Sequence, residues 1–175
     1  MYRIRKLNQF KLPYCLLLLC CFTLSTHAAS TDIALAVWAN EAIVTTYTFD
    51  FEHFLAEEKE IAKYFTAKGW IDYTRAMTDS KLPETIQKNS YYVSAVATMP
   101  PTIKKNHDTT WEVTMPILVI YKNPAYTQKQ NVLVSLTGIR TTKEGVRGYA
   151  ISSLRASVIT DPCRCAKKEL SAAIA

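Results

Sequence analysis

The feature of this 175-residue chain that most constrains its fold is a change in hydrophobic periodicity near residue 90. Before that point, apolar side chains recur every three or four residues, which is typical of helices that bury one face. After it, apolar and polar residues alternate in four runs, which is typical of strands. Because no helical segment separates these runs, we predict an α+β fold with helices packed on one face of an antiparallel sheet.

Four helices are predicted in the first half of the mature chain. Ser30 and Thr31 are possible caps of the first, with Asp32 suited to its first turn. Its apolar face is formed by Ala34, Trp38, Ala42, Thr45 and Phe49. The others are expected at residues 51–64, 70–77 and 83–88. Gly69 is interpreted as a break between the second and the third helix.

Four strands are predicted at residues 91–99, 111–121, 131–141 and 148–159. Pro116 lies inside the second run, which favours an edge position or a β-bulge there. Leu118 and Ile120 make the second face of that run apolar, so we expect its latter half to be covered on both sides. Gly145, in the turn between the last two strands, is free to adopt a positive φ.

Residues 1–28 have the pattern of a secretory signal peptide. A cationic start precedes an apolar run at residues 14–24 and small residues that predict cleavage after Ala28. The alternative is an uncleaved anchor, but this run is shorter than the roughly 17 to 25 apolar residues that a spanning helix needs. We therefore expect a periplasmic protein without a stable membrane span after cleavage; export beyond the cell stays open as an alternative.

Removal of the leader changes the charge of the chain. Four of the 21 basic residues and none of the 15 acidic residues lie in the leader, which leaves a net charge of +2. With no basic stripe in what remains, nucleic acid is not an expected partner. The remaining residues suffice for one domain, at 30–160, followed by a C-terminal tail at 161–175.

Catalytic motifs are absent from the sequence. There is no phosphate-binding glycine loop, nucleophile elbow or metal-binding helix motif, and His53 and His107 are expected to be exposed. Arg140 is expected at a strand end. We predict no enzyme activity, no cofactor and no metal site. The tail carries a possible disulfide between Cys163 and Cys165, for which either a redox role or no further role stays open.

Several short phrases resemble one known family in their order and spacing. They extend over about residues 37–155 and comprise Trp38 with Ala42, Tyr47 with Phe49, residues 64–66 and 69–70, Trp111-Glu112-Val113 with Pro116, residues 130–132, Arg140, and Gly148 with Ile151. This series resembles the IcmL/DotI-like family, which is associated with type IVB secretion and with conjugation machinery. Its members have been called macrophage-killing proteins.

The resemblance implies a fold and a role. The periplasmic domain of the family is similar to that of VirB8, with an NTF2-like arrangement of helices on a curved antiparallel sheet. In this chain, we expect that sheet to have four strands. It implies a soluble, non-enzymatic assembly component whose partners are envelope or secretion-apparatus proteins, with a homo-oligomer left open. Well-known members have a transmembrane helix where this chain has a leader. The core or interface aromatics are then Trp38, Phe65, Trp70 and Trp111.

The alternative hypothesis is an NTF2-like small-ligand-binding protein or enzyme with an apolar pocket. It rests on fold analogy alone. It requires a cavity in which a carboxylic acid faces a tyrosine, for which Asp72 and Tyr92 are the candidates.

Overall fold

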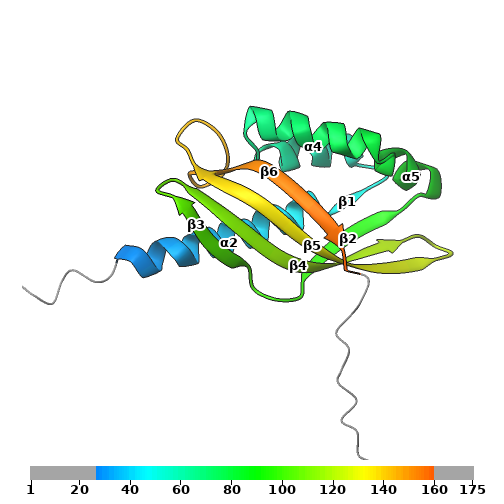
Figure 1. Cartoon of the computed structure of the whole chain (residues 1–175). Coiled ribbons are helices and arrows are strands. Elements are labelled where there is room, and N and C mark those ends of the chain that lie inside the picture. The colour runs from blue at the N-terminus through cyan, green and yellow to red at the C-terminus, as the bar shows by residue number, and fades with distance from the viewer. Residues whose placement is uncertain (1–26, 160–175) are drawn as a thin grey trace, which may run out of the picture. The chain divides into compact units, whose positions relative to one another are not determined.

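The computed structural model describes residues 27–159 (Figure 1). The chain divides into two compact units, Met1–Ala34 and Leu35–Ala175. In the first unit, the described residues form the beginning of helix α2 (His27–Thr46). Because this helix already includes Ser30 and Thr31, the prediction that they cap it is wrong. All other described elements belong to the second unit.

Three shorter helices follow along the chain: α3 (Phe54–Ala62), α4 (Ala67–Asp79) and α5 (Leu82–Asn89). Thr66 caps α4, since its side-chain oxygen accepts a hydrogen bond of 3.0 Å from the backbone N–H of Gly69. Gly69 therefore lies within the first turn of α4, and the prediction that it separates two helices is wrong.

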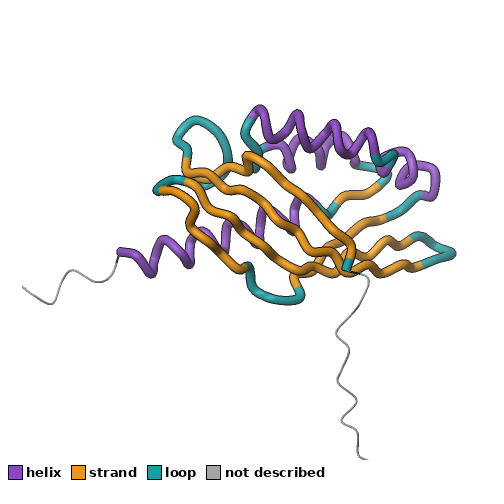
Figure 2. Tube along the Cα trace, in the orientation of Figure 1, coloured by secondary structure: helices purple, strands orange, loops and turns teal. Residues whose placement is uncertain are grey.

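The sheet has six strands rather than the predicted four. They are β1 (Phe49–Asp50), β2 (Tyr92–Ala97), β3 (Thr102–His107), β4 (Thr110–Lys122), β5 (Thr127–Arg140) and β6 (Tyr149–Val158). All pairs are antiparallel, in the order β1-β2-β4-β5-β6, with β3 also paired to β4. Figure 2 shows the strands crossing the second unit as one curled sheet. Gly145 has a φ of 79°, as its turn position predicts.

Pro116 occupies a junction in the sheet. On one side of β4, β2 pairs as far as Ile117 and β3 begins its pairing at Thr114, so Pro116 falls between the two partners. Neither β2 nor β3 pairs with Pro116, so the proline needs no N–H toward them. Its carbonyl accepts a 3.0 Å hydrogen bond from the N–H of Thr98. The expectation of an edge strand or a bulge is therefore replaced by a gap between two neighbouring strands.

The hydrophobic core lies between the helices and the inner face of the sheet. The inner face is supplied by alternate strand residues, among them Val93, Val113, Met115, Ile117, Val119, Val134 and Leu136. On the outer face, Leu118 and Ile120 are only half-buried, and their neighbour Val96 is exposed. The prediction that both faces are covered is thus wrong within residues 27–159, since the helices bury the inner face alone.

The first half of β6 is held by the segment that leads into α4. The N–H of Thr66 donates to the carbonyl of Ile151 at 2.9 Å, and the N–H of Ile151 donates to the carbonyl of Tyr64 at 2.8 Å. Phe65 and Ile151 form an isolated parallel bridge. These bonds fix the start of α4 against the edge of the sheet.

Candidate functional site

A pocket of about 570 Å³ opens between the end of α2, the helices α4 and α5, and the inner face of the sheet. We call it the tyrosine pocket, because three tyrosines that are far apart in the sequence line it: Tyr47 just after α2, Tyr73 on α4 and Tyr121 on β4. The rest of its lining is mostly apolar and includes Phe49, Met77, Leu82, Val93 and Leu154.

Aromatic packing positions two of the three tyrosines. Tyr73 lies on α4 and stacks with Phe65 and Trp70, at ring-centroid distances of 5.1 and 5.5 Å. Tyr121, near the end of β4, meets the edge of Tyr91 at 6.1 Å. Each ring is therefore held by a neighbour that does not line the pocket.

The hydroxyls in the tyrosine pocket stay protonated at physiological pH. Burial raises the pKa of Tyr47, and the charge of Tyr121 raises it further. Burial also raises the pKa of Tyr73, to which the charge of Tyr47 adds. Burial also raises the pKa of Tyr121. These side chains can donate and accept hydrogen bonds. Because they keep their protons near neutral pH, they cannot act as general bases there.

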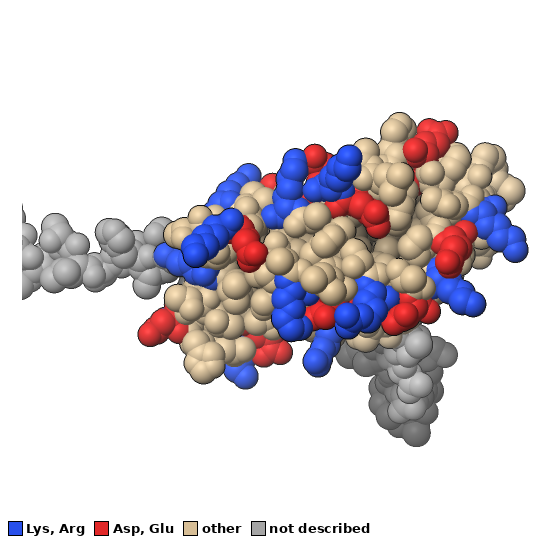
Figure 3. All heavy atoms as spheres, turned by 90° about the horizontal axis from the view of Figure 1, so that it is seen from above, with Lys and Arg blue, Asp and Glu red and all other residues tan. Residues whose placement is uncertain are grey.

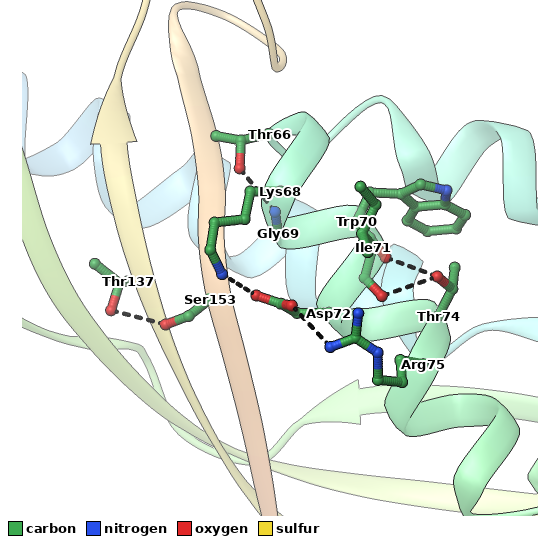
Figure 4. Close-up of polar contacts among 10 residues, drawn as sticks. All are labelled: Thr66, Lys68, Gly69, Trp70, Ile71, Asp72, Thr74, Arg75, Thr137 and Ser153. Atoms are coloured by element: carbon green, nitrogen blue, oxygen red, sulfur yellow. Dashed lines mark hydrogen bonds and ion pairs between the residues drawn. The ribbon is translucent and has the colours of Figure 1, made fainter.

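The two residues expected to supply acid and base chemistry lie outside this pocket. Asp72 is on the exposed side of α4, where Lys68 and Arg75 pair with it (Figure 4). Tyr92 is 45% exposed and meets Phe51 edge-on at 5.3 Å. Among the residues that the structure describes, no Asp, Glu or His lines the tyrosine pocket, so this lining does not supply the carboxylate facing a tyrosine that the enzyme hypothesis requires.

The four aromatics singled out from the sequence lie in two clusters. Trp38 and Trp111 are buried on either side of Tyr149, with centroid distances of 5.4 and 5.8 Å. Phe65 is buried beside the partly exposed Trp70, at 5.7 Å. The structure thus places Trp38, Trp111 and Phe65 in the core and Trp70 at its margin.

A polar contact that the sequence did not indicate links α2 to two distant segments. The hydroxyl of Tyr64 donates to a carboxylate oxygen of Glu41 at 2.8 Å, and Arg147 pairs with the other oxygen at 3.0 Å. These residues are far apart in the sequence and belong to no recognisable motif. Only the tertiary fold brings them together.

The other candidate residues do not converge on a site. His107 is exposed at the end of β3, and Arg140 donates to the hydroxyl of Tyr149 at 3.1 Å. Cys163 and Cys165 lie outside the described residues, so their disulfide stays a prediction. Within residues 27–159, no cluster of three His, Cys, Asp or Glu side chains could hold a metal ion. None of the described helices is long and apolar enough to span a membrane.

His53 pairs with Asp50, at 3.1 Å between Nδ1 and a carboxylate oxygen. The hydrogen bond and charge of Asp50 raise the pKa of His53 above 6.5. Because the folded pKa is the higher one, this pair stabilises the fold below pH 6.5 and its contribution is lost as the pH rises through the folded value. We expect NMR titration to find His53 above its ordinary pKa and Asp50→Asn to restore it; an unchanged pKa in that variant contradicts the assignment.

Charged side chains of both signs are interspersed on the face of the molecule shown in Figure 3. Among the described residues, that face carries no extended area of a single sign. A mixed surface of this kind gives little attraction for a polyanion such as nucleic acid.

A shallow apolar hollow lies between α2 and the loop that joins β2 to β3. We call it the Met99 groove; it is lined by Ala36, Val37, Asn40, Ala97, Thr98, Met99, Pro100 and Pro101. Val37 and Met99 are 51% and 63% exposed. Exposed large apolar side chains gathered around a hollow are a feature of protein contact surfaces.

The family model for the inner-membrane complex component of the type IVb secretion system, DotI/IcmL, matches residues 21–157. The chain belongs to the DotI/IcmL family. An IcmL-like type IV secretion system protein from Legionella pneumophila has a solved structure that is 53% identical to this chain, with a TM-score of 0.73. The match covers 76% of this chain and 96% of that one.

The solved periplasmic domain of DotI is 31% identical to this chain, with a TM-score of 0.67. That match covers 72% of this chain and 94% of the DotI domain. The VirB8 homologue CagV from Helicobacter pylori is 8% identical over 71% of this chain and 97% of that one, with a TM-score of 0.59, so it shows the fold alone. No curated protein sequence matches this chain. Membership of the DotI/IcmL family and the VirB8-like fold, both expected from the sequence phrases, are confirmed.

Proposed function

We propose that this chain is a periplasmic, non-enzymatic assembly subunit of a type IVB secretion apparatus. The observation that carries this proposal is the family match, which extends over residues 21–157 and so includes nearly all of the described fold. The tyrosine pocket supports the non-enzymatic part, because no carboxylate or imidazole of the described residues lines it, and its hydroxyls alone are poorly equipped for acid and base catalysis.

The periplasmic location rests on the leader. Cleavage after Ala28 leaves a mature chain that begins at Ala29 and releases the domain from the membrane on its periplasmic side. Intact-mass measurement of the protein from the periplasmic fraction tests this step. A mass that retains the first 28 residues, or a protein found in the cytoplasm, overturns it.

The Met99 groove is the contact surface that we propose for another component of the apparatus. Its exposed side chains, Val37 and Met99, come from α2 and from the loop that joins β2 to β3. Burial of such apolar area against a partner is favourable by about 25 cal/mol per Å². A subunit with this role needs a surface of this kind and no reactive group.

Photo-crosslinking in secretion-competent cells tests the proposed role. A crosslinking amino acid placed at Met99 is expected to capture an envelope protein of the secretion apparatus. The matched control carries it at Leu55, which is 75% exposed on α3 and outside the groove. Capture from Leu55 alone contradicts the groove as the contact surface, and absence of secretion components from both positions contradicts the assembly role.

A further inference from the structure

We propose that the tyrosine pocket binds a small, uncharged and largely apolar molecule that carries one hydrogen-bonding group. Its volume of about 570 Å³ falls within the 300 to 1,000 Å³ of most small-molecule sites. This inference is independent of the proposed assembly role, because the tyrosine pocket shares no lining residue with the Met99 groove and would take a different class of ligand.

The lining argues for an uncharged molecule. Within residues 27–159, no Asp, Glu, Lys or His belongs to this lining, so a buried charge on the ligand meets no counter-ion there. Arg155 is the one charged residue in the described part of the lining. It pairs in register with Ser135, whereas its neighbours Leu154 and Ala156 pair with the inner-face residues Leu136 and Val134. The guanidinium therefore projects from the opposite face of β6.

The three hydroxyls argue for one polar group on the ligand. Tyr73 makes a single long bond, 3.4 Å to the carbonyl of Thr46. Tyr47 and Tyr121 also line the pocket, and neither forms a side-chain hydrogen bond to another of the described residues. Tyr121 lies near enough to Tyr47 for its charge to raise the pKa of that side chain. Two neighbouring hydroxyls in a mainly apolar cavity provide a donor and an acceptor for one amine, amide, alcohol or ketone group.

Fluorescence titration of the full chain, as recovered from expressing cells, with N-phenylnaphthylamine tests the proposal. This probe is uncharged, apolar and carries one N–H group. We expect a saturable rise in fluorescence, and weaker binding of the anionic anilinonaphthalene sulfonate, which has a similar ring system. No rise with the first probe, or tighter binding of the second, overturns the proposal.

Variants locate the binding. Ala76 and Ala156 line the pocket yet are exposed, so Ala76→Trp and Ala156→Trp fill its mouth without entering the core. Each is expected to weaken binding at least about tenfold, whereas the matched control Ala56→Trp, on the exposed side of α3, leaves it unchanged. Tyr121→Phe is expected to weaken binding by about 2- to 10-fold through one lost hydrogen bond. Undiminished binding in both pocket-filling variants refutes this site.

Discussion

Replacement of Trp38 by alanine is expected to lower the free energy of unfolding by about 4 kcal/mol, within the range for large aromatic side chains in cores. Trp38 is fully buried in the described fold and stacks on Tyr149. It also fills the space above Gly138, where an added Cβ would lie 3.2 Å from its ring. Denaturant unfolding followed by circular dichroism measures this loss.

Trp38→Phe separates packing from polarity. The indole N–H of Trp38 finds no acceptor among the described residues, so removing it relieves an unpaired buried donor. We expect Trp38→Phe to cost less than half of the alanine variant, because the phenyl ring still fills much of the space. Leu55→Ala, at an exposed site, serves as the control with a change below about 0.5 kcal/mol. A loss of less than about 1 kcal/mol in Trp38→Ala contradicts its role in the core.

The division into helices and an antiparallel sheet followed from hydrophobic periodicity, since long runs with one buried face leave a clear pattern. The two strands that sequence reasoning missed lack that pattern. The strand β1 has only two residues, and most of β3 is exposed on both faces, so no alternation of apolar and polar residues marks it. The pairing that defines them comes from their neighbours, β2 and β4.

The sequence suggests that an apolar pocket could exist, but it does not indicate which residues line it. The alternative hypothesis includes an apolar pocket. The tyrosines of the observed pocket lie just after α2, on α4 and on β4, and they share no motif. Asp72 and Tyr92 are the candidates that fold analogy alone offers for an acid facing a tyrosine. Asp72 pairs with Lys68 and Arg75, which lie one turn before and after it on α4, and Tyr92 stays exposed on its strand. Which face of an element meets a cavity depends on the packing angle, which periodicity does not specify.

Gly69→Ala is expected to lower the free energy of unfolding by about 2 kcal/mol, although a glycine-to-alanine change inside a helix ordinarily raises it by about 1 kcal/mol. A Cβ at Gly69 would lie 2.4 Å from the carbonyl oxygen of Ile151 and 3.1 Å from that of Ser152. Both are backbone atoms that cannot rotate away. The start of α4 must therefore move off β6, which weakens the bond between the Thr66 N–H and the Ile151 carbonyl.

The sign of the change makes this experiment decisive. In the control, Ala56→Gly on the exposed side of α3, the reverse substitution is expected to destabilise by about 1 kcal/mol, which shows that a Cβ is favourable in a helix with open surroundings. If Gly69→Ala stabilises the protein as well, α4 does not pack closely on β6. If it destabilises, the glycine that looks like a helix break in the sequence is instead a requirement for contact between helix and sheet.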